Sequence, residues 1–231
     1  MSEIKLSKRL STAASFVRSG AFVADIGTDH AYLPIYLVQN GVSERVIASD
    51  VNEGPIATAK ENISKFGLGD RILTQIANGL DGIEKYEPND ILICGMGGEL
   101  IAKILSASEY VRNPSIRLIL QPMTSIYELR EFLSCGFAVV DEQIVLEDGK
   151  IYHVIVAEYD GLNHPHSKIE LELGKINIQH KSEEFRHLLV STINKKEKKV
   201  SGLKIGGYET KEIEEEIAEL EKLKNDLYGA I

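Results

Sequence analysis

The residues best suited to chemistry stand together in the stretch D25-I-G-T-D-H-A-Y-L-P34, directly after the apolar run F22-V-A24. A glycine that follows an apolar run is typical of a nucleotide-binding loop, where the chain turns from a strand into a helix. In dinucleotide folds this loop carries three glycines and holds a pyrophosphate at the helix N-terminus. Here Gly27 is the only glycine of the loop, and Asp29 and His30 stand where the others would be. A carboxylate at Asp29 would repel a pyrophosphate and therefore favours a cationic ligand.

The charge of this loop suits S-adenosylmethionine, which has no phosphate and carries a sulfonium and an ammonium. We expect Gly27 to let the backbone approach this ligand closely. Asp25 is expected to accept its ammonium or the surrounding water shell. Two structural alternatives stay open. Asp29 could only cap the helix expected to begin near Ala31, since aspartate is a preferred N-cap, and Asp25 could only stabilise its own turn.

The ends of the next two predicted strands carry further candidates. Asp50, in S49-D-V-N52, lies 23 residues beyond Gly27. An acid at about this spacing bonds the ribose hydroxyls of an adenosine in dinucleotide folds. The following strand ends in A77-N-G79, where Asn78 either contacts the adenine or forms a plain Asn-Gly turn.

Two later motifs complete the candidate site. Three of the four residues G95-M-G-G98 are glycines, which implies close approach of the backbone to the transferred methyl group and the incoming nucleophile. In Q121-P-M123, the amide of Gln121 can pair with a base edge and Pro122 fixes the turn. Met123 is interpreted as a packing residue.

Alternating strands and helices are expected to position these motifs. Short apolar, β-branched runs predict five strands, each followed by a turn and a helical pattern. This alternation forms a mainly parallel sheet, so the motifs should meet beyond the C-terminal ends of its strands. The expected strands are 22–26, 45–49, 72–77, 90–94 and 116–120, and the expected helices are 31–40, 55–66, 99–106 and 125–134.

The pattern changes after these elements. Two long β-rich runs, 138–146 and 151–159, are joined through Asp148-Gly149, which predicts an antiparallel hairpin. Five parallel strands that end in such a hairpin resemble the seven-stranded, Rossmann-like α/β sheet of class I methyltransferases. We therefore predict a cofactor-binding catalytic domain over residues 1–160.

Residues 161–231 are predicted to form a C-terminal helical hairpin, coiled-coil-like in character. Residues 160–165 are interpreted as a linker, and 167–200 and 210–227 as helices separated by Gly202, Gly206 and Gly207. An amphipathic helix is also predicted near the N-terminus, at 6–18.

The 231-residue chain has a net charge of −9, which taken as an average argues against a nucleic-acid partner. Its C-terminal segment differs, because residues 186–204 hold six basic side chains and one acid, whereas 209–226 hold eight acids and three bases. The absence of long apolar runs and of a signal-peptide pattern predicts a cytoplasmic protein without membrane association. Cys94 and Cys135 lack metal-ligand spacing and are interpreted as buried free thiols, so no metal is expected.

With these motifs assembled, the chain resembles the bacterial tRNA (adenine-22-N1)-methyltransferase family over nearly its whole length. The resemblance rests on the motif at 25–34, on 49–52, 95–98 and 121–123, and on the predicted terminal helices. It implies S-adenosylmethionine as the methyl donor and N1 of an adenine in tRNA as the acceptor. The chain lacks the Asn/Asp-Pro-Pro-aromatic motif of DNA adenine-N6 methyltransferases, which fits N1 chemistry better.

Adenine N1 has a free lone pair, so positioning is expected to supply much of the acceleration. Because the product base is cationic, Asp29 is predicted to stabilise it, while His30 and Tyr32 orient or stack it. Alternatively, His30 only caps a helix and Tyr32 belongs to the core. The residues predicted to bind S-adenosylmethionine are Asp25, Gly27, Thr28, Asp29, Asp50, Val51, Asn78, Gly79, Gly95, Met96 and Gly97.

A paired or stacked target base must be extruded, and Tyr36 is a further candidate to stack with it. Arg9 and Arg18, in the N-terminal helix, are expected to contact phosphates. The run K195-K-E-K-K199 is expected to be a second RNA anchor, unless it is only a solvated helix face. The residues predicted to bind the substrate are Arg9, Tyr36, Gly98, Gln121, Lys195, Lys196, Lys198 and Lys199.

Three other functions stay open at this point. A class I methyltransferase could act on another RNA or on a small molecule. A Rossmann oxidoreductase is disfavoured by the missing glycines and by the terminal hairpin, and a non-catalytic binding module would use the helical tail for assembly. The oligomeric state is open between a monomer and a weak dimer.

Overall fold

The computed structural model describes residues 4–229 and divides the chain into two compact units, with the boundary between His166 and Ser167. The predicted boundary, between domains 1–160 and 161–231, lies six residues earlier. Strand β7 continues to Asn163 and therefore includes four of the residues predicted as a linker. Residues 1–3 and 230–231, which the two predicted domains include, lie outside the described residues.

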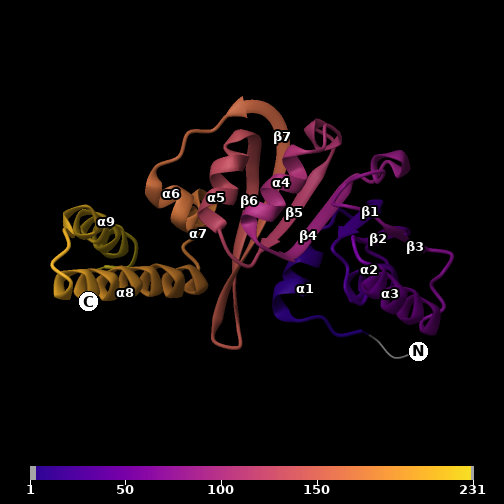
Figure 1. Ribbon diagram of the computed structural model, residues 1–231, viewed down its shortest axis with the longest axis horizontal. Helices are drawn as coiled ribbons and strands as arrows, with labels where there is room; N and C mark the ends of the chain where they lie inside the picture. Colours follow the sequence, from indigo (N-terminus) through magenta and orange to yellow (C-terminus); the bar gives the residue numbers. More distant parts are fainter. Residues whose placement is uncertain (1–3, 230–231) are drawn as a thin grey trace. The chain divides into compact units, whose positions relative to one another are not determined.

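The first unit is built on a seven-stranded sheet with the order β3-β2-β1-β4-β5-β7-β6 (Figure 1). Strands β1 to β5 pair in parallel, and β7 is antiparallel to both β5 and β6. This confirms the predicted arrangement of five parallel strands and a terminal hairpin. The strands are β1 Val23–Ile26, β2 Val46–Asp50, β3 Ile72–Ile76, β4 Asp90–Met96, β5 Arg117–Pro122, β6 Cys135–Glu147 and β7 Lys150–Asn163.

Helices cover both faces of this sheet. Side chains of α1, α2 and α3 pack into one buried cluster, and those of α4 and α5 pack into another. The helices are α1 Lys8–Ser15, α2 Tyr32–Gln39, α3 Glu53–Lys65, α4 Gly98–Ser106 and α5 Ile126–Leu133, with short 3-10 helices η1 Glu84–Tyr86 and η2 Tyr110–Arg112.

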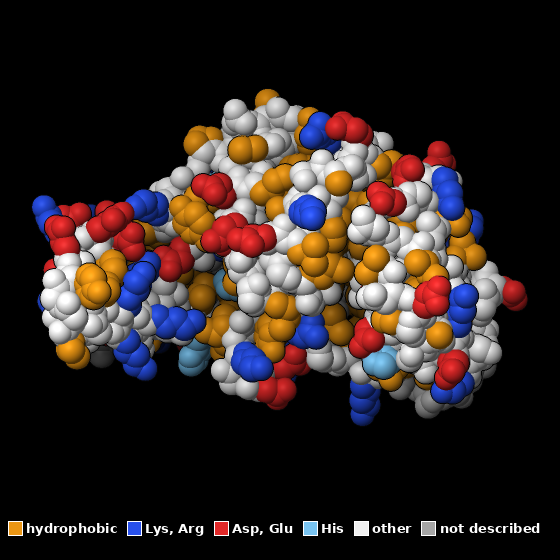
Figure 2. Space-filling model, in the orientation of Figure 1, with side chains coloured by type: hydrophobic (Ala, Val, Ile, Leu, Met, Phe, Trp, Pro, Cys, Tyr) orange, Lys and Arg blue, Asp and Glu red, His pale blue; other side chains and the backbone are white. Residues whose placement is uncertain are grey.

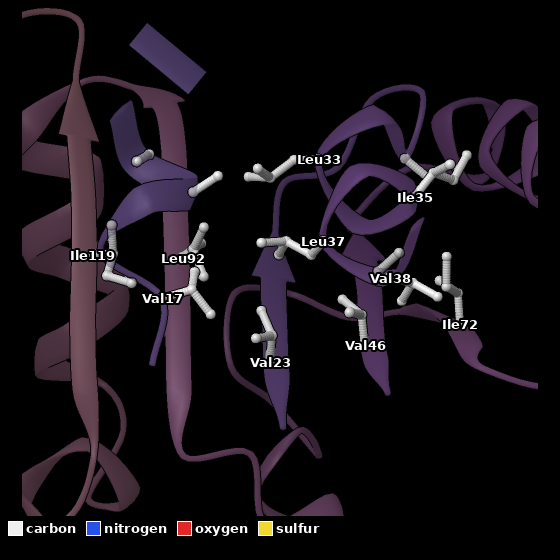
Figure 3. Close-up of a cluster of buried hydrophobic side chains, with 14 of the residues drawn as sticks. Val17, Val23, Leu33, Ile35, Leu37, Val38, Val46, Ile72, Leu92 and Ile119 are labelled. Atoms are coloured by element: carbon white, nitrogen blue, oxygen red, sulfur yellow. The ribbon is translucent and has the colours of Figure 1, made fainter. Parts of the chain in front are cut away.

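The central strands are mostly apolar because both of their faces are buried. Val23 contributes to the cluster under α2, whereas its neighbour Ala24 contributes to the cluster on the opposite face. Figure 3 shows side chains of the first cluster, among them Leu37 of α2 and Val23 of β1. A sheet buried in this way is a rigid support for the loops at its C-terminal edge.

The hairpin of β6 and β7 turns at Asp148 and Gly149, whose φ angles are 50° and 71°. A two-residue hairpin turn of type I′ needs positive φ at both positions, which Asp-Gly adopts readily. The register Glu147↔Lys150 places these two residues alone in the turn, as the sequence predicts.

Within its described residues, 167–229, the second unit has four helices, where the sequence predicted two. The predicted helix at 167–200 is wrong as a single element, because the chain breaks at Gly174, with φ 91°, and at Lys181, with φ 53°. The third helix also runs through Gly202, which was expected in the connection. The helices are α6 Lys168–Leu173, α7 Lys175–His180, α8 Glu183–Ile205 and α9 Lys211–Tyr228.

Within this unit α8 and α9 pack against each other, and the chain returns between them through residues 206–210 (Figure 1). Their coiled-coil-like character stays a prediction. Among residues 4–229, no helix combines the length and the apolar character that crossing a membrane requires.

Candidate active site

A pocket of about 360 Å³ opens at the C-terminal ends of β1 and β4, in the first unit. Parallel sheets place ligand sites at this edge. The pocket brings together the loop that follows β1, the end of β4 and the start of α1. Its lining residues are Arg9, Leu10, Asp25, Gly27, Thr28, Asp29, His30, Ala31, Tyr32, Leu33, Cys94 and Gly95.

The loop after β1 is held in a tight conformation. The amides of Gly27 and Thr28 both donate to the carbonyl of Ser49, each at 2.8 Å. Gly27 has φ 82°, and an added Cβ would lie 2.1 Å from the terminal methyl of Met96. Gly27 therefore provides both a left-handed backbone and room for a close neighbour.

Asp29 does not cap the following helix, so the capping alternative is wrong. The N-cap of α2 is Ala31, which has φ 56° and is buried, and no side chain caps this helix end. The predicted helix start at Ala31 is correspondingly one residue early. The side chain of Asp29 is 75 % exposed, and it makes no capping hydrogen bond at the N-terminus of α2.

Asp29, His30 and Tyr32 form an exposed cluster that lines the pocket. His30 Nε2 lies 3.1 Å from Asp29 Oδ2, and the His30 ring stacks on Tyr32 with 5.2 Å between centroids and 20° between planes. Tyr32 is 46 % exposed, so it is not a core residue. Asn62 of α3 donates to the carbonyl of His30 at 3.0 Å and fixes the loop from outside. The sequence carries no signal for this contact, since Asn62 lies in an ordinary helical pattern.

Asp25 lies deeper, with 5 % of its surface exposed. Burial raises the pKa of its carboxyl to about 6, against the opposing effect of a hydrogen bond with Thr28. Burial, together with the charge of Asp25, also raises the pKa of the Cys94 thiol, while Arg9 acts in the opposite direction. Cys94 is therefore a neutral thiol in the pocket wall. Cys135 is exposed, so the prediction that it is buried is wrong.

The predicted ribose and adenine residues lie outside this pocket, at neighbouring strand ends. Asp50 ends β2 and accepts a hydrogen bond from the Asn52 amide at 2.8 Å, and Val51 beside it is 57 % exposed. Asn78 lines a second pocket of about 430 Å³, between the loop after β3 and α4. An added Cβ on Gly79 would lie 3.0 Å from Ile104, so this glycine allows close packing.

The glycines at the end of β4 and directly after it have separate roles. Gly95, with φ 83°, lines the first pocket. Gly97 is the N-cap of α4. An added Cβ on Gly98 would lie 2.1 Å from the carbonyl oxygen of Ser125, so Gly98 lets α4 pack against the start of α5. Gly98 is buried, which differs from the predicted contact with substrate.

Three of the predicted RNA contacts have other partners in the structure. Gln121 is fully buried, and its amide is used by Arg9 and by the Pro122 carbonyl, so it offers no edge to a base. Tyr36 packs against the buried cluster and does not line the pocket. Arg18 forms hydrogen bonds to fully buried Asp90, at the N-terminal edge of the sheet. The sequence could not reveal the partners Arg9 of Gln121 and Asp90 of Arg18, because these lie 112 and 72 residues away along the chain.

The lysines between 195 and 199 in α8 fall into two groups. Lys196 is 19 % exposed and bridges Glu172 at 3.1 Å and Glu216 at 2.9 Å, so it stabilises the second unit and is not presented to RNA. Lys195, Lys198 and Lys199 are exposed on one side of the helix. Figure 2 shows basic side chains along α8 and acidic side chains gathered over α9.

This combination of sheet order, acidic glycine loop and pocket defines the chain as a class I methyltransferase. Residues 6–155 match the methyltransferase domain family. The tRNA (adenine(22)-N(1))-methyltransferase of Bacillus subtilis is 44 % identical over 177 residues, which cover 76 % of this chain and 74 % of that one. The chain belongs to this family of tRNA methyltransferases.

Solved structures agree with this assignment over almost the entire chain. The B. subtilis m1A22 tRNA methyltransferase TrmK has a TM-score of 0.83 and 34 % identity, covering 97 % of this chain and 99 % of that one. M. capricolum TrmK, in complex with the cofactor product S-adenosyl-homocysteine, has a TM-score of 0.82 and 30 % identity, covering 96 % and 99 %. Among residues 4–229, no group of three or more His, Cys, Asp or Glu side chains is arranged to hold a metal ion.

Proposed function

We propose that this protein transfers a methyl group from S-adenosylmethionine to N1 of adenine 22 in tRNA, in the cytoplasm. The observation that carries the proposal is the acid-lined pocket at the ends of β1 and β4, in a chain 44 % identical to an enzyme of that name. An oxidoreductase that uses a nicotinamide dinucleotide would need a loop able to hold a pyrophosphate. Asp25 and Asp29 make the loop unsuitable for that anion.

The pocket residues suit S-adenosylmethionine, whose sulfonium methyl group is electrophilic when the cofactor is bound. Asp25 offers a buried carboxyl group for a cationic part of the molecule. Gly27 and Gly95 supply backbone without side chains at the pocket wall. Asp50, at the neighbouring strand end, is proposed to bond the ribose hydroxyls.

Asp29 is proposed as the catalytic residue that stabilises charge. Adenine N1 already carries a lone pair, so no residue has to remove a proton before the transfer. The methylated base is cationic, and an exposed carboxylate beside it lowers the energy of the charge that develops. His30 and Tyr32, stacked at the same place, are proposed to hold the base in position.

The second unit is proposed to bind tRNA through Lys195, Lys198 and Lys199. These exposed side chains provide positive charge in a protein whose net charge is −9. Phosphate contacts of this kind supply affinity without reading sequence.

Product analysis tests the proposed reaction. The protein is incubated with labelled S-adenosylmethionine and total tRNA from a strain that lacks the enzyme, and the digested nucleosides are separated. We expect label in 1-methyladenosine. Label in a different nucleoside, or none in tRNA, would overturn the proposal.

A further inference from the structure

The loop that joins α8 to α9 carries two large apolar side chains that face solvent (Figure 1). Ile205 ends α8 and is 90 % exposed, and Tyr208 in the loop is 68 % exposed. Among residues 4–229, no other large apolar side chain is as exposed as either of them. Single exposed apolar residues are ordinary, but two so close together at the tip of a helical hairpin indicate a surface that contacts a partner.

Hydrogen bonds hold this loop in a defined conformation. The Tyr208 amide donates to the Leu203 carbonyl at 3.0 Å, and the Gly207 amide donates to the Lys204 carbonyl at 3.1 Å. With Gly207 at φ 72°, these two bonds form a Schellman motif that closes the C-terminus of α8. An added Cβ on Gly206 would lie 2.7 Å from the Tyr208 ring, so the ring packs over a residue that has no side chain. The tyrosine is therefore presented to solvent by an ordered loop.

The face of α8 that leads to this loop is cationic. Lys195, Lys198, Gly202 and Ile205 are all exposed and follow one another at helical spacing, so they lie along one side of α8. An added Cβ on Gly202 would meet no atom within 4 Å, which leaves the helix backbone open to a close neighbour. At 1.5 Å per residue, Lys195 and Ile205 lie about 15 Å apart along the helix. Positive charge, bare backbone and an apolar end thus form one continuous strip.

This strip suits an RNA strand better than a protein surface. Its lysines can contact phosphates. At the loop the positive charge is balanced, since Lys204 lies 2.6 Å from Glu214, and the group left to make contact is the ring of Tyr208. Bases stack on exposed aromatic rings, and proteins recognise RNA mainly at bases that are unpaired and accessible.

We propose that Tyr208 stacks on an unpaired base of the tRNA, with Ile205 extending the apolar surface beside it. The inference deepens the proposed function and rests on it, because it adds a base contact to the phosphate contacts of the second unit. Phosphate contacts occur all along an RNA strand, whereas a stacked base must be free of pairing. Tyr208 is then a positioning residue, which fixes where the tRNA lies on the protein.

Binding of tRNA to three variants of Tyr208 tests the stacking. We expect Tyr208→Ala to weaken tRNA binding by about 5- to 100-fold. Tyr208→Phe keeps the ring and should bind like the wild type, whereas Tyr208→Leu keeps only an apolar side chain and should lose most of this affinity. Because no charge is removed, the salt dependence of binding should not change. Affinity for S-adenosyl-homocysteine should also stay the same in all three variants.

Fluorescence gives a direct measurement at the same position. The chain contains no tryptophan, so Tyr208→Trp introduces a single indole. A base stacked on this indole quenches its emission, and we expect quenching that saturates as tRNA is added. Glu219→Trp, at an exposed position of the acidic helix α9, is the matched control and should keep its emission. A purely structural role for Tyr208 would produce no quenching.

Three results would overturn the inference. Wild-type tRNA affinity in Tyr208→Ala, or unquenched emission in Tyr208→Trp, would show that no base stacks there. Wild-type affinity in Tyr208→Leu would show a general apolar contact. Sedimentation that finds self-association lost in Tyr208→Ala, with tRNA affinity unchanged, would show that the loop binds a second copy of the chain. All three leave the proposed function intact, whereas failure of the wild type to methylate tRNA would overturn that function itself.

Discussion

Asp29 stands at the pocket wall with 75 % of its side chain exposed and with His30 as its neighbour. We predict that Asp29→Ala lowers kcat by about 10²- to 10³-fold, as removal of an electrostatic stabiliser does in other enzymes. The Kd for S-adenosyl-homocysteine should change much less, and the melting temperature should stay the same because the side chain is exposed. Steady-state kinetics and calorimetry measure the two effects. Equal losses in turnover and in cofactor affinity would make Asp29 a cofactor ligand only.

Asp25 is predicted to make the stability of the protein depend on pH. Its pKa is raised from 3.8 to about 6, so between these values the folded state holds a proton that the unfolded state has released. The free energy of unfolding therefore falls as the pH rises from 3.8 to about 6, by at most about 3 kcal/mol. Asp25→Asn should be more stable than the wild type at pH 7.5, and the difference should shrink toward pH 4.

Urea denaturation at several pH values measures this effect. Exposed Asp29→Asn is the matched control and should follow the wild-type curve. If Asp25→Asn is no more stable than the wild type at pH 7.5, burial of the ionised Asp25 carboxylate does not destabilise the folded protein. The same variant should bind S-adenosyl-homocysteine more weakly, a loss of function that accompanies the gain in stability.

The sequence indicates which residues meet at the pocket where this depends only on neighbours along the chain. Asp25 lies in β1, and Gly27, Asp29 and His30 directly follow it, so their meeting at one pocket could be foreseen from strand-end geometry. The partner of Arg9 could not be foreseen, because Gln121 is 112 residues away and nothing in either neighbourhood indicates the contact. Whether a polar side chain faces a ligand or another side chain is decided by such distant packing.

At the scale of elements, the junction of α4 and α5 depends on Gly98. An added Cβ would lie 2.1 Å from a backbone carbonyl oxygen, which has little freedom to move. We predict that Gly98→Ala lowers the free energy of unfolding by about 1–3 kcal/mol. Gly54→Ala is the control, since this helical glycine has open space around it and should be neutral or stabilised by up to about 1 kcal/mol.

Urea denaturation of both variants measures the difference. A Gly98→Ala protein as stable as the wild type would contradict the packing role. That result would also leave the predicted contact of Gly98 with the substrate possible.

Helices and strands could be predicted where the spacing of apolar residues and the residues of the adjoining turns indicate the same element. The seven strands follow apolar runs, and Asp148-Gly149 indicates its own turn. The break after α7 was not predictable, because Lys181 adopts φ 53° and lysine carries no signal for that conformation. Ser182, which caps α8 by accepting from the Phe185 amide at 3.1 Å, was a local signal that the helical pattern obscured.

At the scale of the whole molecule, a net charge of −9 is combined with a basic surface on α8. We predict that a Lys195→Ala, Lys198→Ala, Lys199→Ala triple variant binds tRNA more weakly and with a smaller dependence on salt. The slope of log K against log salt should fall in magnitude by up to about 2 to 3, because each lost phosphate contact reduces it by roughly 0.7 to 0.9. Affinity for S-adenosyl-homocysteine should not change.

Lys196→Ala is the contrasting variant within residues 195–199, because its side chain is paired and the other three lysines are exposed. It removes the cation that joins Glu172 to Glu216, so it should lower the melting temperature of the protein. The triple variant removes only exposed charges and should melt like the wild type. Unchanged tRNA affinity and salt dependence in the triple variant would show that these lysines form only a solvated helix face.

Methylation of N1 of adenine 22 at this pocket can be tested with two tRNA transcripts that differ at one position. A tRNA transcript with adenine at position 22 and the same transcript with guanine there are each incubated with the protein and S-adenosylmethionine. Because a methyl group on N1 blocks the Watson–Crick edge, reverse transcription stops at the modified base. We predict a stop at position 22 and 1-methyladenosine in the first transcript only. Equal methylation of both transcripts, or a product other than 1-methyladenosine, would show that adenine 22 is not the methylated base.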